Sequence, residues 1–178
     1  GQVSDTVSIA TDQAMDAVMK AKETGNSIIR LVLPDGQDVV DQTRINVLKD
    51  VAQLLAENKL TLEISTENVH LEIPTDSLAG VTQDFYFRLV PIKEEAKRQE
   101  IETRARKEEA VRAMLQTNDV HVIGRPMVIE TNLPQRPVTV TLPVKDIALP
   151  IDTAERQAFL NRLAVYIEHS DGEKKVVQ

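Results

Sequence analysis

Residues 69–80, VHLEIPTDSLAG, change from the period of a strand to the signals of a helix at a single proline. Apolar residues alternate with polar ones from Val69 to Ile73, so they line one face of an extended chain. Pro74 ends the ladder because proline has no N–H group to donate. The threonine, aspartate and serine that follow are types that cap a helix start, and Gly80 is a type that ends a helix. The stretch therefore predicts a strand that turns directly into a short helix.

The same junction recurs along the chain. Residues 7–12 (VSIATD), 45–50 (INVLKD) and 71–76 (LEIPTD) each carry a strand end into an aspartate, and a looser copy ends at Asp146. An aspartate in the first helical turn meets the exposed backbone N–H groups and the positive end of the helix dipole. Two explanations for the similarity are open: a repeated structural unit, or the chemistry that all strand-to-helix junctions share. In either case the building unit is strand, corner, short helix, strand.

This unit predicts an α+β, β-rich fold in which antiparallel strands are joined by short helices. Helices are expected from Thr11, a suitable N-cap, up to Gly25, over 48–56, after Pro74, and around 154–161. The runs 60–64 and 69–73 should pair as a hairpin, and a turn at 170–173 should join the last two strands. Strands are expected at 6–9, 27–33, 43–47, 60–64, 69–73, 120–123, 127–131, 138–142, 163–167 and 174–177.

A highly charged segment, residues 91–117, separates an N-terminal part, 1–90, from C-terminal strands, 118–178, that complete one module or two closely packed halves. Glutamates precede arginines by four residues, a spacing that stabilises a helix. The segment is therefore expected to form one long charged helix or a helical hairpin, acting as a surface brace. The expected pairs are Glu94–Arg98, Glu100–Arg104, Glu102–Arg106 and Glu108–Arg112, and the residues expected to turn inward are Ile101, Ala105, Val111 and Leu115.

Composition excludes several classes of function. The chain of 178 residues has a net charge of −7, which disfavours nucleic acid and anionic membranes as partners. Aromatic residues make up only 3%, so stacking platforms for sugars or bases are scarce. The absence of cysteine rules out disulfides and thiol chemistry, and no apolar run is long enough to span a membrane. The start, Gly1-Gln2-Val3, suggests a fragment of a longer protein.

No residue is predicted to be catalytic, cofactor-binding or metal-ligating, so the chain is expected not to be an enzyme. His70, His121 and His169 are far apart in the sequence and lack a second ligand at metal-site spacing. Calcium is a possible but unsupported ligand, because residues 35–41, DGQDVVD, lack the closing glutamate of a calcium loop and predict a plain turn. Neither a GxSxG elbow nor a glycine-rich phosphate loop is present, since Gly124 stands alone.

Several strand-like blocks carry a more specific pattern: LTLEI (60–64) leading into VHLEIP (69–74) and DFYFRL (84–89), then VIGRPMVIE (122–130), RPVTVTLPV (136–144) and LAVYI (163–167). Together these blocks resemble the β-rich repeat modules of S-layer-type cell-surface proteins of Gram-positive bacteria, which often carry S-layer homology domains elsewhere in the chain. The resemblance implies an extracellular, cell-wall location, a structural or interaction role, and neighbouring modules as partners. It supplies no functional residues, and no S-layer homology domain lies within the chain.

Three hypotheses follow. The leading one is a non-enzymatic structural module of a bacterial cell-surface or S-layer-type protein, acting as a stalk, spacer or assembly element. The second is a ligand-binding or adhesion module in the same setting. The third is a cytoplasmic scaffold domain that uses the charged segment for coiled-coil contact.

Overall fold

The chain folds into two compact units. The computed structural model describes residues 1–145 and 147–178. Unit 1 contains Gly1–Ile92 and Pro126–Pro143, and unit 2 contains Lys93–Arg125 and Val144–Gln178. These units divide the chain differently from the sequence segments 1–90, 91–117 and 118–178, because the strands within 126–143 pair with strands of the first 92 residues.

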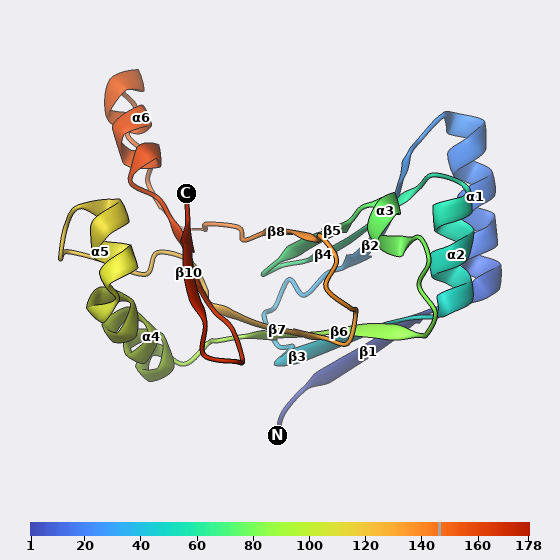
Figure 1. Ribbon diagram of the computed structural model, residues 1–178, viewed down its shortest axis with the longest axis horizontal. Coiled ribbons are helices and arrows are strands. Elements are labelled where there is room, and N and C mark those ends of the chain that lie inside the picture. The colour runs from blue at the N-terminus through green and yellow to red at the C-terminus, as the bar shows by residue number, and fades with distance from the viewer. Residues whose placement is uncertain (146) are drawn as a thin grey trace. The chain divides into compact units, whose positions relative to one another are not determined.

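Unit 1 is built from two four-stranded sheets and three helices (Figure 1). Sheet A has the strand order β1-β3-β6-β7, and sheet B has the order β2-β4-β5-β8. The strands of sheet A are β1 (Ser4–Ile9), β3 (Gln42–Val47), β6 (Phe85–Pro91) and β7 (Met127–Thr131). Those of sheet B are β2 (Ile28–Leu33), β4 (Thr61–Thr66), β5 (His70–Ile73) and β8 (Thr139–Thr141). The helices are α1 (Thr11–Thr24), α2 (Lys49–Glu57) and α3 (Thr75–Leu78).

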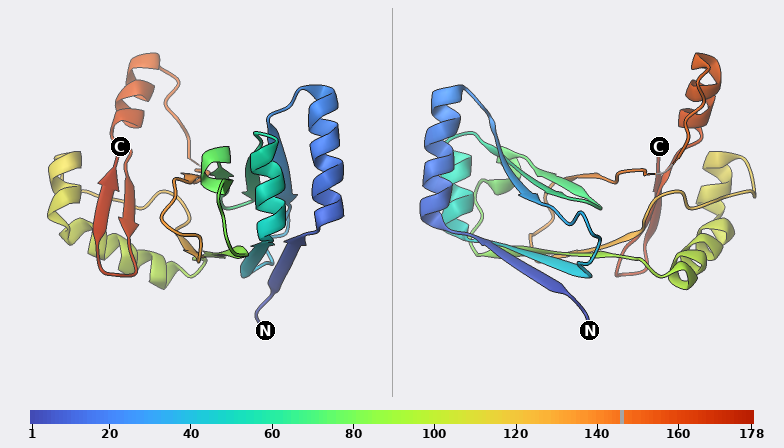
Figure 2. Two further views of the ribbon diagram at one scale, coloured as in Figure 1. Left: turned by 45° about the vertical axis from the view of Figure 1, so that its right-hand side comes forward. Right: turned by 180° about the vertical axis from the view of Figure 1, so that it is seen from behind.

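The chain crosses from one sheet to the other each time it passes a corner. The connections β1-α1-β2, β3-α2-β4 and β5-α3-β6 each join a strand of one sheet to the equivalent strand of the other. Two further crossings are made without a helix, from β2 to β3 through the turn that contains Asp35 and from β7 to β8 through a loop. Helices α1 and α2 pack side by side at one end of the two sheets (Figures 1 and 2). As a result, equivalent positions in the two sheets are occupied by strands that are neighbours along the chain: β1 and β2, β3 and β4, β6 and β5, and β7 and β8.

The recurrent sequence junctions lie at these corners. Ala10, Leu48 and Pro74 are the N-cap residues, all extended with φ between −73° and −67°, and none caps its helix through a side chain. The expectation that Thr11 is the N-cap is wrong, because Thr11 is already the first helical residue. The fourth junction, which ends at Asp146, lies outside the described residues.

Strand pairing confirms the α+β class and adds two parallel contacts. β1 pairs with β3 in parallel, and β2 pairs with β4 in the same way, because both members of each pair follow or precede a helix at the same end. The remaining pairs of the two sheets are antiparallel, including the expected hairpin of β4 and β5. Each sheet is therefore mixed, with antiparallel pairing in the majority.

The two sheets share one apolar core with the helices. Alternate residues of each strand point inward, as the period of two requires, and Phe87, at 2% exposure, is among the largest of them. Burial of this aliphatic surface is the main stabilising contribution to unit 1. The most deeply buried strand residues are Ile45, Val47, Leu62, Ile64, Leu71, Ile73, Phe87 and Leu89, and they meet Val51, Leu55 and Leu78 from the helices.

The outer face of sheet A is a polar ladder that crosses all four strands. Gln42 donates from Nε2 to Ser4 Oγ at 2.7 Å and accepts from Arg88 Nη2 at 2.9 Å. Arg88 in turn pairs with Glu130 at 3.1 Å. The ladder links β1, β3, β6 and β7 through side chains as well as through the backbone, so it fixes the strand register on the solvent side.

The outer face of sheet B contains a like-charge pair. Glu63 and Glu72 stand directly opposite each other on β4 and β5, an arrangement that costs free energy. Arg30 on β2 offsets this cost, since its Nε lies 3.5 Å from Glu63 Oε1. His70 Nδ1 lies 2.8 Å from Ser65 Oγ on the same face.

Loop side chains replace the missing caps. Asp84, in the loop before β6, accepts the N–H of Lys49 at 2.8 Å and so caps α2 from outside the helix. Arg136 donates from Nη1 to the carbonyls of Ser77, at 2.9 Å, and of Ala79, where α3 ends. Ser77, only 1% exposed, donates its hydroxyl to the carbonyl of Pro137 at 2.5 Å. These bonds tie the loops of sheet A and sheet B to the helical corners.

Unit 2 contains α4 (Glu95–Lys107), α5 (Glu109–Leu115), α6 (Thr153–Asn161) and an antiparallel ribbon of β9 (Val165–Glu168) and β10 (Lys174–Val177). The charged segment is therefore not one long helix. Glu108, extended with φ −75° and ψ 122°, ends α4 and begins α5. Two of the four residues expected to turn inward, Ala105 and Val111, are buried, and Ile101 and Leu115 are half-buried.

The charged side chains of α4 mostly bind other parts of unit 2. Glu102 and Arg106 form the expected i,i+4 pair, whereas Arg104 binds Glu168 of β9 and Glu108 binds Lys174 of β10. Segment 120–123 is not a strand, since side chains of α4 satisfy its backbone instead of a neighbouring strand. The bonds run from Arg98 Nη2 to Val122 O (2.7 Å), from Val122 N to Glu102 Oε2 (2.9 Å) and from Arg106 Nε to Val120 O (2.8 Å).

The external cap of α2 leads to a first prediction. Asp84→Ala should lower the free energy of unfolding by about 1 kcal/mol, because the Lys49 N–H loses its acceptor. Urea denaturation followed by circular dichroism measures the change. Asp50→Ala, which removes a first-turn charge but keeps the Asp84 bond, is the matched control and should cost less. Equal losses in the two variants would contradict the capping role.

Candidate functional site

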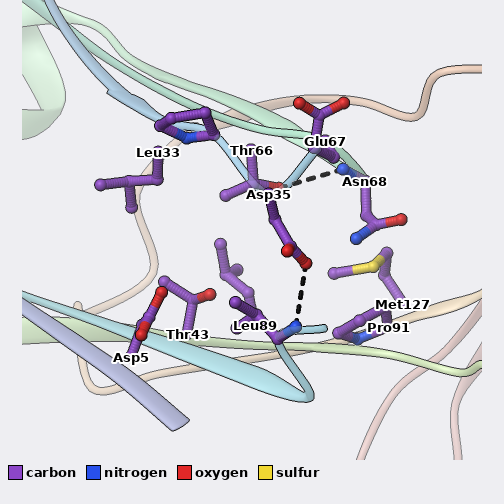
Figure 3. Close-up of a pocket in the computed structure, with 12 residues that line it drawn as sticks. Asp5, Leu33, Asp35, Thr43, Thr66, Glu67, Asn68, Leu89, Pro91 and Met127 are labelled. Carbon is purple, nitrogen blue, oxygen red and sulfur yellow. Dashed lines mark hydrogen bonds between the residues drawn. The ribbon is translucent and has the colours of Figure 1, made fainter. Parts of the chain in front are cut away.

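The turn between β2 and β3 holds a small polar pocket (Figure 3). Its volume is about 20 Å³, room for one water molecule. Asp35 points between the two sheets in Figure 3, and its two carboxylate oxygens accept the N–H groups of Val39 at 3.0 Å and Val40 at 2.9 Å. The lining residues are Asp5, Leu33, Pro34, Asp35, Val40, Thr43, Thr66, Glu67, Asn68, Leu89, Pro91 and Met127.

The other acidic residues of this turn also serve the backbone. Asp38 has a positive φ of 55°, and its N–H bonds to the carbonyl of Asp35 at 3.0 Å, which closes the turn. Asp41 accepts the N–H of Val3 at 2.7 Å and donates its own N–H to the carbonyl of Val3 at 2.8 Å. The arrangement anchors the start of the chain to β3. Within residues 1–145 and 147–178, no group of three or more histidines and carboxylates is placed to hold a metal ion.

An apolar groove of about 170 Å³ opens at the free edge of unit 1, between β1 and β2. Val7, Ile9, Ile29 and Leu31 point inward there but are only half-buried, because each edge strand has a neighbour on one side only. The lining residues are Val7, Ser8, Ile9, Gln13, Ala14, Ala17, Ile29, Arg30, Leu31, Val51, Leu55 and Leu62. The groove can take an apolar side chain or a small apolar group.

The three histidines lie in separate places. His70 is on the outer face of sheet B, and His169 takes part through its backbone in the turn between β9 and β10. In unit 2, His121 Nε2 lies 2.8 Å from Asp119 Oδ1, and His121 Nδ1 lies 3.8 Å from Glu102 Oε1. Within the described residues, none of the three belongs to a group of three or more side chains that could hold a metal ion.

Glu102 is the carboxylate with the most altered environment in this part of unit 2. Its pKa lies below the usual glutamate value, chiefly because the Val122 N–H binds the ionised form. Desolvation raises the pKa, whereas the charges of Arg106, His121 and Arg98 lower it further. A carboxyl with a lowered pKa in the folded state stabilises the fold above its unfolded pKa. This contribution is lost as the pH falls from the ordinary glutamate range through the lowered folded value.

Sequence reasoning did not identify two of these features. The groove residues Val7, Ile9, Ile29 and Leu31 read as ordinary core, since alternation gives the face of a strand but not its position at a sheet edge. The charges of Arg98, Glu102 and Arg106 at i,i+4 spacing are evident in the sequence. Their binding to the backbone of segment 120–123 is not, because that segment alternates like a strand and was expected to pair with one.

The Asp35 turn gives a second prediction. Asp35→Ala should destabilise the chain by about 1–2 kcal/mol, because two backbone N–H groups lose a charged acceptor. Asp35→Asn keeps one acceptor oxygen and should lose less, which makes it the matched control. Thermal unfolding with excess calcium should give the same midpoint as with a chelator. A midpoint that rises with calcium and loses this rise in Asp35→Asn would instead show a cation site.

The groove gives a third prediction. Ala17→Leu should raise the free energy of unfolding by about 1 kcal/mol, because the added isopropyl group fills apolar space. Ala96→Leu, at an exposed position of α4, controls for helix propensity and should change stability little. Denaturant midpoints measure both. A loss of stability in Ala17→Leu would mean that the side chain is overpacked and that the groove is closed.

Comparisons with protein-family models, with curated proteins and with solved structures gave no match. In the described residues no helix is both long and apolar enough to cross a bilayer. The resemblance to modules of S-layer-type surface proteins, which depends on strand patterns, therefore stays a prediction.

Proposed function

We propose that this chain is a non-enzymatic structural module of a bacterial cell-surface or S-layer-type protein, acting as a stalk, spacer or assembly element. The observation that carries the proposal is the use of carboxylates within the scaffold. Asp35, Asp41 and Asp84 each bind backbone N–H groups at turns and helix starts, and Glu130 ends the ladder across sheet A. These carboxylates hold loops, helix starts and strand register, which is the use expected in a structural module.

The distribution of charge also supports a structural role. Unit 1 contains 8 basic and 15 acidic residues and so carries the whole net charge of −7, while unit 2 contains 13 of each. An acidic two-sheet unit repels its own copies at long range, and its charge disfavours anionic polymers and lipids as partners. Such a surface keeps a module soluble when many copies are linked or crowded together.

A ligand-binding or adhesion module in the same setting is the second candidate. It is favoured by the groove at the β1 and β2 edge, where about 170 Å³ of apolar space is open. An adhesion role would need a partner that inserts an apolar group between Ile29 and Val7. Leu31→Lys would then abolish binding of that partner without changing the location of the protein.

A cytoplasmic scaffold role through the charged segment is less well supported. Of the apolar residues that a coiled coil would use, Ala105 and Val111 are buried inside unit 2, and Ile101 and Leu115 are half-buried. A coiled coil needs such residues exposed in a continuous stripe along one helix, and α4 and α5 are interrupted at Glu108. These observations favour the role of a brace over that of a contact element.

Antibody labelling tests the proposal as a fourth prediction. Antibodies raised against the chain should label intact cells of the organism that encodes it, and brief protease treatment of those cells should remove the signal. An antibody to a cytoplasmic protein is the control and should label only permeabilised cells. If the antibodies against the chain also label only permeabilised cells, as the control antibody does, a surface module is excluded and the scaffold hypothesis is favoured.

A further inference from the structure

The ribbon of β9 and β10 is attached to the helices of unit 2 by two ion pairs on one rung. Glu168 and Lys174 are direct partners across the ribbon. Glu168 accepts from Arg104 through Nε at 3.1 and 3.2 Å and through Nη2 at 3.0 Å. Lys174 Nζ lies 2.9 Å from Glu108 Oε1. The rung therefore reaches α4 with one side chain and the break between α4 and α5 with the other.

The break between the helices is what makes the second pair possible. Glu108 has an extended backbone, and its side chain is taken up by Lys174 rather than by Arg112 four residues later. These two pairs raise the pKa of Arg104, mainly through the hydrogen bond to Glu168, and the pKa of Lys174, mainly through the hydrogen bond to Glu108. A raised pKa means that the charged forms of Arg104 and Lys174 are stabilised by these contacts, so both charges favour the docked ribbon.

Apolar contact between the ribbon and the helices is slight by comparison. The buried apolar residues described in unit 2 are Ala105, Val111 and Val120, and none belongs to β9 or β10. Tyr166 and Val176, partners on the face of the ribbon that carries the rung, are half-buried. The Tyr166 hydroxyl is buried without a hydrogen-bond partner, which makes docking less favourable.

We propose that the β9–β10 ribbon is a salt-sensitive latch: it is docked on α4 and α5 at low ionic strength and released at high ionic strength while unit 1 stays folded. The Glu168 and Arg104 side chains are 31% and 45% exposed, and those of Glu108 and Lys174 are 30% and 36% exposed. Ion pairs of this exposure are weak and are screened by added salt. A two-stranded ribbon is only marginally stable by itself, so release also frees its amides for exchange.

Amide hydrogen exchange of the unmodified chain at low and at high sodium chloride tests the latch. The amides of β9 and β10 should lose roughly tenfold or more of their protection when salt is raised to a level that screens exposed pairs. The amides of β3 and β6 in unit 1 serve as the control in the same sample and should not change. Unchanged protection of the ribbon, or equal loss in both units, would overturn the proposal.

Tyrosine absorbance gives a second readout. The chain has two tyrosines and no tryptophan, so Tyr86→Phe leaves Tyr166 as the single reporter of unit 2. Burial raises the pKa of Tyr166, which should fall toward its ordinary value when salt releases the ribbon. In the matched variant Tyr166→Phe, Tyr86 reports on unit 1 and should show no such change.

Exchanging the charges separates a latch from a general effect of salt. Glu168→Arg should release the ribbon already at low salt, because it faces Arg104. Adding Arg104→Glu restores an opposite pair and should recover both protection and salt dependence. Failure of the double variant to recover, with unit 1 still folded, would mean that the ion pair does not hold the ribbon. If either variant fails to fold, the salt series on the unmodified chain still decides the proposal.

Discussion

The corner at which each strand enters a helix constrains the rest of unit 1. An extended N-cap residue turns the chain through this corner, and Ala10, Leu48 and Pro74 offer no side-chain acceptor for the helix N–H groups. Acceptors must then come from elsewhere, as Asp84 does for α2. Loops that would otherwise be free become fixed to the corners. Since each crossing places consecutive strands in opposite sheets, the two sheets acquire the same order and share one core.

The two faces of each sheet follow from the same constraint. Inner residues are mostly aliphatic, with Phe85 and Phe87 as the aromatic exceptions, because the chain has few aromatic side chains to fill the core. Outer residues of sheet A help to fix the register of the strands, through the side-chain ladder that runs from Ser4 to Glu130. In sheet B a side-chain bond joins Ser65 to His70 across β4 and β5, but Glu63 faces Glu72 and depends on Arg30 for compensation. The outer face of sheet A thus contributes more to strand order than that of sheet B.

Alternation and turn chemistry predicted most elements of this fold, including the β4–β5 hairpin and the last two strands, because both signals are local. Alternation shows which face of a strand a residue occupies, but not which strand lies beside it. The parallel pairs β1–β3 and β2–β4 and the open edge at β1 and β2 were therefore not predictable. Segment 120–123 alternates like a strand, but the helix stripe with Glu102 at its centre satisfies its backbone. The partner of Glu108, at the break between the helices, is also distant in sequence, since it is Lys174. The Asp35 turn was read correctly because its acceptors and donors are neighbours in sequence.

The two units are stabilised by different forces, and salt acts on them in opposite directions. Unit 1 depends on apolar burial and carries all of the net charge, so screening reduces its self-repulsion and favours the folded state. Unit 2 is electrically neutral and buries few apolar side chains, so its stability depends more on specific pairs such as Arg104–Glu168. Screening weakens those pairs without relieving any net repulsion. An increase in ionic strength therefore widens the difference in stability between the units, and unit 2 can rearrange while unit 1 keeps its form.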